Sequence, residues 1–224
     1  MILWYRNLLA RLVHLVLRCH YRVTMQGREV FDGKRPILLL PNHTAYVDPL
    51  LLCSEIYDVP VCPMVDERFM RHPLLKHTMR WIGAVEVPDL MAESKEESLK
   101  SKAAAASQLT RIALDTLREG RSLIFYPSGH IKTVDREVIG NRRLAYEVCR
   151  ELPENTTVVL CRMRGLEESR WSKLKTTTHT LRRPVNFYFE DRTADLRRWA
   201  QTMERRQFNE QLENWYNQLT PAAE

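Results

Sequence analysis

A histidine and an aspartate lie five residues apart near the start of the chain, with a proline close to each of them. The stretch runs Pro41-Asn42-His43-Thr44-Ala45-Tyr46-Val47-Asp48-Pro49. In a continuous helix this spacing would separate the two side chains by about 140°, but the prolines predict a turn that folds the imidazole onto the carboxylate. A histidine held in this way keeps one ring nitrogen free to accept a proton, as a general base for a hydroxyl does. The alternative is a helix-capping aspartate beside an unrelated histidine.

The segments on either side of the turn predict a strand and a helix. Pro36 to Pro41 is a short apolar run bracketed by prolines, which is typical of a buried strand. Asp48-Pro49 predicts the start of a helix that continues to about Tyr57, with Asp48 as its N-cap. One carboxylate oxygen would then accept from the helix backbone and the other from the histidine ring. Because ligands bind at the carboxyl ends of strands in α/β sheets, the exit of this strand is the candidate site.

The rest of the chain alternates strand and helix patterns. Expected strands cover residues 21–26, 59–65, 83–87, 121–126, 156–163 and 185–189, and expected helices cover 66–81, 94–119, 141–152 and 194–218. This alternation predicts an α/β fold, with one domain whose mixed, mostly parallel sheet is flanked by helices.

Residues 1–20 predict an amphipathic helix. The segment is rich in leucine and valine, but Arg6, Arg11, His14 and Arg18 interrupt it, so no run reaches the roughly 18 apolar residues of a spanning helix. Most of these polar side chains share one stripe, which suits a helix lying in a membrane interface with its arginines at the lipid phosphates. A core helix or an oligomer contact is the alternative. We expect residues 21–224 to form the folded domain.

The net charge of +6 indicates an anionic partner, such as acidic lipid headgroups, phosphorylated substrates or nucleic acid. The last predicted helix interleaves acidic residues with its arginines and repeats large apolar residues at helical spacing. This pattern favours a core-packing helix, so no nucleic acid is expected as a partner. The five scattered cysteines show no metal-site spacing, and neither a disulfide nor a metal is expected.

The pattern Asn42-His43-x4-Asp48-Pro49 after an apolar strand resembles the first motif of the glycerolipid acyltransferase superfamily. In that family the histidine deprotonates the acceptor hydroxyl, which attacks an acyl thioester, and the aspartate orients the histidine. The resemblance implies these roles for His43 and Asp48. It extends to Tyr126-Pro127-Ser128-Gly129-His130, which stands where the family carries Phe-Pro-Glu-Gly. Residues 158–166 are similar to a later strand of the subgroup that acts on 2-acylglycerophosphoethanolamine.

The sequence departs from the family pattern at two motifs. Ser128 replaces the family's glutamate and His130 its following basic residue, and the second motif, at residues 83–88, lacks the usual arginine for the acceptor phosphate. Arginines elsewhere can replace it, although each is alternatively a solvated surface charge. The candidate substrate-binding residues are therefore Asn42, Tyr126, Pro127, Ser128, Gly129, His130, Arg142, Arg143 and Arg164, and Arg162 is a further candidate.

The resemblance implies transfer of a fatty acyl group from acyl-CoA or acyl-ACP to the hydroxyl of a lysophospholipid. The thioester donor is already activated, so no cofactor is expected. Membrane lipids and the acyl donor are the expected partners, at the cytoplasmic face of a membrane with peripheral or monotopic attachment. Two alternatives stay open: a catalytically weak lipid- or acyl-carrier-binding protein that retains the fold, and a hydrolase that uses water as the acceptor.

Overall fold

The computed structural model describes residues 2–67, 76, 79, 83–87, 99–174 and 182–218. The strands are β1 (Tyr21–Gln26), β2 (Ile37–Pro41), β3 (Val61–Asp66), β4 (Val85–Val87), β5 (Ser122–Ile124), β6 (Thr157–Arg164) and β7 (Arg183–Asp191). The helices are α1 (Ile2–His20), the 3-10 helix η1 (Arg28–Val30), α2 (Asp48–Glu55), α5 (Leu99–Arg118), α6 (Leu144–Arg150), α7 (Thr193–Thr202) and α8 (Arg205–Asn217). Most of the helix predicted over 66–81, and the start of the one predicted over 94–119, lie outside the described residues.

Seven strands of the described chain form one sheet in the order β1-β7-β6-β2-β5-β3-β4. The five from β6 to β4 are parallel, whereas β7 runs antiparallel to β6 and pairs in parallel with β1. The predicted mixed, mostly parallel sheet is confirmed. β2 lies inside the sheet with all of its residues buried, which explains its uninterrupted apolar sequence. Because β6, β2 and β5 are parallel, the segments that follow them meet at one edge of the sheet.

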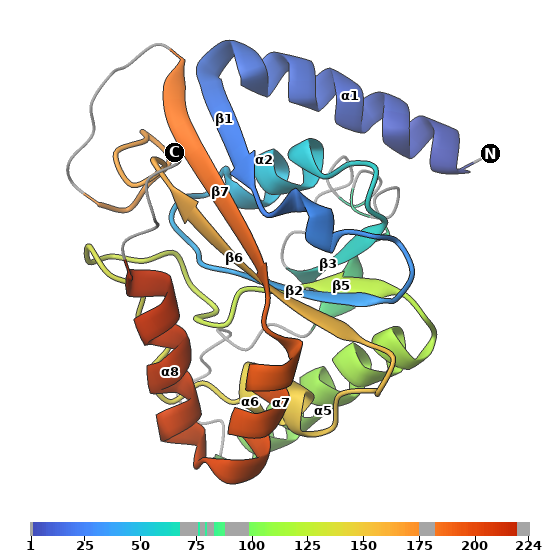
Figure 1. Ribbon diagram of the computed structural model, residues 1–224, viewed down its shortest axis with the longest axis vertical. Helices are drawn as coiled ribbons and strands as arrows, with labels where there is room; N and C mark the ends of the chain where they lie inside the picture. The colour runs from blue at the N-terminus through green and yellow to red at the C-terminus, as the bar shows by residue number, and fades with distance from the viewer. Residues whose placement is uncertain are drawn as a thin grey trace.

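Helices cover both faces of the sheet (Figure 1). On one face, α1 and α2 pack over alternate strand residues that include Leu39, Ile124 and Val159. On the other face, α5, α6, α7 and α8 enclose the intervening residues, among them Leu38, Leu123 and Leu160. The two-residue periodicity of the strands therefore divides their side chains between two hydrophobic cores.

The prediction of one terminal helix over 194–218 was wrong, because the chain breaks into α7 and α8. Met203 and Glu204 have extended backbone angles between the two helices. Glu204 then begins α8 with a capping box: its side chain binds the first turn, and the Gln207 side chain accepts from the Glu204 backbone N–H at 3.2 Å. The spacing of Glu204 and Gln207 is the sequence signal that a continuous helical periodicity concealed.

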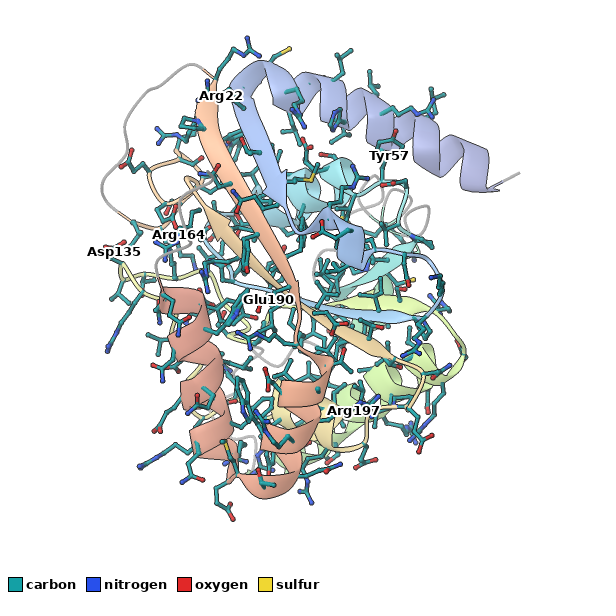
Figure 2. The ribbon with its side chains drawn as sticks, in the orientation of Figure 1. Arg22, Tyr57, Asp135, Arg164, Glu190 and Arg197 are labelled. Atoms are coloured by element: carbon teal, nitrogen blue, oxygen red, sulfur yellow. The ribbon has the colours of Figure 1, made fainter. Side chains whose placement is uncertain are left out.

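The polar stripe of α1 faces the protein rather than the outside. Arg18 donates from Nε and Nη2 to the two carboxylate oxygens of Glu55 at 2.9 and 2.7 Å, and the Glu55 side chain is fully buried. His14 Nδ1 lies 3.3 Å from the same carboxylate. The Arg11 guanidinium lies 5.6 Å from the ring centroid of Tyr57, which Figure 2 shows beneath α1. Arg18 and His14 thus serve as partners of a buried carboxylate, which requires them, and the contact of this stripe with lipid phosphates stays a prediction.

The outward face of α1 is apolar instead. Among the described side chains of α1, the large apolar ones that are exposed, with 51% to 65% of their surface accessible, are Leu8, Leu12, Leu15 and Val16. These positions recur at helical spacing and form one stripe. No helix in the described ranges has the length and apolar content needed to cross a bilayer.

The Arg18→Ala substitution is expected to lower the free energy of unfolding by about 2–3 kcal/mol, because it leaves the buried Glu55 carboxylate without its main partner. Urea denaturation measures the loss. The Arg18→Ala/Glu55→Ala double variant should lose less than the sum of the two single variants, since no unpaired charge remains. Additive losses would contradict the assignment of the pair.

Candidate active site

Asp48 lies at the centre of the turn that follows β2, and its side chain is fully buried. Its Oδ2 accepts from the backbone N–H groups of Thr44 and Ala45 at 2.5 and 2.9 Å. The Thr44 hydroxyl donates to the same carboxylate, at 3.0 Å from Oδ1. The predicted turn is confirmed, but the backbone donors belong to the turn and not to α2. Asp48 was predicted as the N-cap, whereas Val47 is the N-cap and Asp48 is the first helical residue.

The His43 ring is fixed by two contacts. Its Nδ1 lies 3.1 Å from Asp48 Oδ2, and Tyr126 stacks on the ring with the centroids 4.1 Å apart. The His43 side chain keeps 16% of its surface exposed, whereas Asp48 keeps none. When Nδ1–H donates to the carboxylate, Nε2 of the neutral ring has a free lone pair. The arrangement is that of a base oriented by an aspartate.

Hydrogen bonds from β6 and from the segment after β5 hold the backbone on both sides of His43. The Asn42 side chain donates to Met163 O at 3.0 Å and accepts from Met163 N at 2.6 Å, so it joins the ends of β2 and β6. On the other side, Lys132 N donates to His43 O at 2.9 Å. Asn42 was predicted to bind substrate, but both ends of its amide are occupied by backbone. Its observed contacts position the turn.

The predicted substrate-binding turn after β5 is compact. The Ser128 hydroxyl donates to His130 O at 3.1 Å, and His130 Nδ1 lies 2.7 Å from Ser128 O. Gly129 has a φ of 65°, in the left-handed region that glycine adopts most easily. Ser128 and Pro127 are buried, and the Ser128 hydroxyl is directed at backbone.

A polar cavity of about 210 Å³ lies beside Asn42. Its wall carries groups of both signs, from Lys132, Asp135, Arg136, Glu137, Arg164 and Glu167, together with Met163, Tyr216 and Asn217. Figure 2 shows Asp135 and Arg164 close together near the C-terminal end of α8. The sequence had not indicated Lys132 or Glu137, which belong to the irregular segment after the turn.

The structure separates the candidate arginines. Arg164 lies on the cavity wall and donates to Gln218 O at 2.8 Å. Arg142 and Arg143 are exposed just before α6 and are not part of this wall. Arg162 is 3% exposed. It packs over the rings of Trp215 and Tyr188, in the hydrophobic core on the face that α5 to α8 cover. Only Arg164 of these four is placed beside the cavity.

Tyr126 presents its ring, and not its hydroxyl, to His43. The hydroxyl is buried without a hydrogen-bond partner among the described residues. Burial, with the Asp48 charge as a smaller cause, raises the pKa of this hydroxyl well above its usual value. The hydroxyl therefore stays neutral, and the ring acts as a support for the imidazole.

The Tyr126→Phe variant is expected to be more stable than wild type by about 1 kcal/mol, because it removes an unpaired buried hydroxyl and keeps the stack. Tyr126→Ala removes the ring and should cost about 3–5 kcal/mol. Thermal and chemical unfolding of the two variants measure both effects. A Phe variant less stable than wild type would mean that the hydroxyl is hydrogen-bonded in solution.

Comparisons with known proteins place this chain in a family. Residues 22–166, more than half of the chain, match the family described as Acyltransferase. The chain belongs to the acyltransferase family. Its fold is similar to the crystal structure of the 1-acyl-sn-glycerophosphate (LPA) acyltransferase PlsC from Thermotoga maritima, with a TM-score of 0.58 and 13% identity over 97% of this chain and 81% of that one. None of the curated proteins compared with the chain matches it.

The region that matches the acyltransferase family contains the His43–Asp48 pair and the turn after β5. It also contains Lys132, Glu137 and Arg164 of the cavity wall, whereas Tyr216 and Asn217 come from α8, beyond the match. In this acyltransferase the cavity is therefore completed by a helix outside the matched region.

Proposed function

We propose that this acyltransferase moves a fatty acyl group from acyl-CoA or acyl carrier protein to the free hydroxyl of a lysophospholipid. One observation carries the proposal: His43 is hydrogen-bonded to a fully buried Asp48 at the carboxyl edge of the sheet. Binding alone gives no reason to fix a partly exposed imidazole on a buried carboxylate. The catalytically weak binding protein is for this reason the less favoured alternative.

The proposed reaction needs only a base and an activated donor. His43 Nε2 takes the proton of the acceptor hydroxyl while its oxygen attacks the thioester carbonyl. Asp48 keeps the proton on Nδ1 and stabilises the imidazolium. The tetrahedral intermediate then collapses, the C–S bond breaks, and the thiolate receives the proton from the imidazolium. The products are an ester and a free thiol.

Two observations favour a lysophospholipid as the acceptor. The cavity beside the site carries basic groups that suit a phosphate, namely Lys132, Arg136 and Arg164. It also carries carboxylates, so a headgroup with both charges fits better than a bare phosphate. The structural relative is described as an acyltransferase of 1-acyl-sn-glycerophosphate, and a related acceptor is proposed for this chain.

We further propose that the apolar face of α1 lies in a membrane surface, at the cytoplasmic side. With its polar stripe engaged by Glu55 and Tyr57, the helix turns four apolar side chains outward. Aromatic and apolar side chains next to the site, Tyr46 and Leu50, are also 59% and 50% exposed. Such a face suits insertion to the depth of the headgroups and would bring a lipid acceptor to the cavity.

The Leu12→Ser/Leu15→Ser double variant should bind liposomes at least about 30-fold more weakly, because two leucines no longer enter the apolar phase. Co-sedimentation with phospholipid vesicles measures this affinity. Both side chains are more than half exposed, so the melting temperature should stay within about 2 °C of wild type. Unchanged vesicle binding by the folded variant would remove α1 from the proposal.

A panel of acceptors tests the function as a whole. Wild-type protein is incubated with acyl-CoA or acyl-ACP and one of several lysophospholipids, and mass spectrometry detects the diacyl product. The proposal expects diacyl product from at least one acceptor. Free fatty acid as the only product would identify a hydrolase. If folded protein binds the lipids but forms no product, the result would favour the alternative of a lipid-binding protein that retains the fold.

A further inference from the structure

The Glu137 carboxylate is a buried acidic group near the site that the proposed reaction does not use. Glu137 is 2% exposed and lies in the irregular segment between the turn after β5 and α6. Its backbone is clamped by Asn217 of α8, which accepts from Glu137 N at 2.8 Å and donates to Glu137 O at 3.0 Å. Two residues later, Ile139 N and Gly140 N both donate to Glu213 of α8 at 2.7 Å. The fold therefore holds this acidic residue in the interior by contacts to its main chain.

The carboxylate itself has no hydrogen bond to any described residue, and both of its oxygens are inaccessible to solvent. Burial raises the pKa of the Glu137 carboxyl to about 7. The Ser128 hydroxyl, Lys132 and the His43 backbone N–H lie close enough to oppose that rise, and Asp48 adds to it. The Ser128 hydroxyl nevertheless donates to His130 O. Glu137 is thus a buried acceptor without a hydrogen bond to a described residue, and it lies near the His43 backbone.

A buried carboxylate without a partner costs stability and calls for an explanation. Glu137 lines the cavity beside Asn42, together with Lys132 and Arg164. It also lies beside Ser128, the position at which this chain lacks the carboxylate that the resembling motif carries. A ligand in the cavity would meet basic groups, with one unsatisfied acceptor covered in the cavity wall. The group it should bring to Glu137 is a hydrogen-bond donor.

We propose that Glu137 binds the acyl acceptor, accepting a hydrogen bond from an N–H or O–H group of the acceptor headgroup in this cavity, and so supplies the carboxylate that position 128 lacks. The inference rests on the proposed function for the identity of the ligand. It makes Glu137 a specificity-determining residue, which favours headgroups that donate a hydrogen bond over headgroups of the same charge that cannot.

The matched ligands are short-chain, monomeric lysophosphatidylethanolamine and lysophosphatidylcholine, which differ in whether the ammonium group carries N–H donors. Lysophosphatidylglycerol provides a third arm, with hydroxyl donors only. The variant is Glu137→Met, which is similar in length and removes the acceptor. Glu210→Met, at an exposed position of α8 paired with Arg206, is the control for the exchange itself. Titration calorimetry measures binding without requiring turnover.

Wild type should bind the ethanolamine lipid about tenfold or more tightly than the choline lipid, and Glu137→Met should bind the two equally. The glycerol arm shows whether a hydroxyl serves as well as an ammonium. Equal affinities in wild type, or the same preference in Glu137→Met, would overturn the proposal. Because binding is read separately from catalysis, a wild type that binds selectively but does not turn over would refute the proposed function and leave this inference standing.

Stability distinguishes binding from a structural role. Folding raises the pKa of Glu137 above its unfolded value, so the folded state loses stability as pH rises from the usual carboxyl range through about 7. The neighbouring charged and titratable groups, Lys132, Asp48 and Tyr216, are present in both proteins. Glu137→Met should therefore melt no lower than wild type at pH 5 and higher at pH 8. A lower melting temperature at both pH values, with equal loss of binding for all lipids, would contradict a role in binding.

Discussion

Replacing Asp48 with asparagine is expected to lower the rate of acyl transfer roughly ten-thousandfold, the size of the loss found when the carboxylate orienting a catalytic histidine is neutralised. The amide oxygen can still accept from Thr44 N and Ala45 N, so the turn should keep its shape. The same oxygen would face His43 Nδ1, but a neutral amide stabilises the imidazolium that forms when His43 takes a proton far less than a carboxylate does. The rate at saturating donor and acceptor measures this effect, because the loss belongs to the transition state and not to binding.

The same substitution should lower the free energy of unfolding by about 1–3 kcal/mol. A buried carboxylate that accepts from His43, Thr44 and Ala45 is exchanged for a neutral acceptor with weaker hydrogen bonds. Chemical denaturation of Asp48→Asn beside wild type measures it. An Asn variant that retained more than about a tenth of wild-type activity would show that Asp48 only caps the turn and does not support catalysis.

The His43→Ala variant is expected to lose between about a hundredfold and ten-thousandfold in rate while remaining folded. Its imidazole is the proposed base, and its removal leaves Asp48 still bonded to Thr44 and Ala45. The loss of stability should therefore be only about 1 kcal/mol. His20→Ala, the same exchange on the exposed end of α1, is the matched control and should have wild-type activity.

Initial rates of acyl transfer with each variant, together with their thermal unfolding, test this prediction. A His43→Ala protein with more than about a third of wild-type activity would exclude His43 as the base, whatever the acceptor. A variant that is inactive and also unfolded would be replaced by His43→Gln, which keeps a donor for Asp48 but cannot accept the proton.

The site's local geometry was accessible from sequence, because it depends on neighbours in the chain. Pro41 and Pro49 predicted the turn, and the turn predicted the contact of His43 with Asp48, which the structure contains. The backbone partners of Asp48 were misassigned to α2. A capping aspartate and an aspartate one residue inside the helix have the same local sequence, and only the fold of the turn distinguishes them.

The rest of the site depends on contacts between distant parts of the chain. Asn42 at the end of β2 binds Met163 of the neighbouring strand β6, which is 121 residues away in the sequence. No local pattern encodes that pairing. Glu137 lies in a segment without periodicity, and its inward position comes from Asn217. The inward orientation of the polar stripe of α1 could not be predicted either. The spacing of its residues indicates an amphipathic helix, but it does not reveal the buried Glu55 that decides which face turns inward.

The most direct test of the account is the rate of thiol release from the acyl donor by wild-type protein, with and without the preferred lysophospholipid. Acyl transfer to a hydroxyl predicts release that requires the acceptor and equals the diacyl product mole for mole. Release at the same rate without acceptor would contradict the account, because water would then be the substrate that His43 activates.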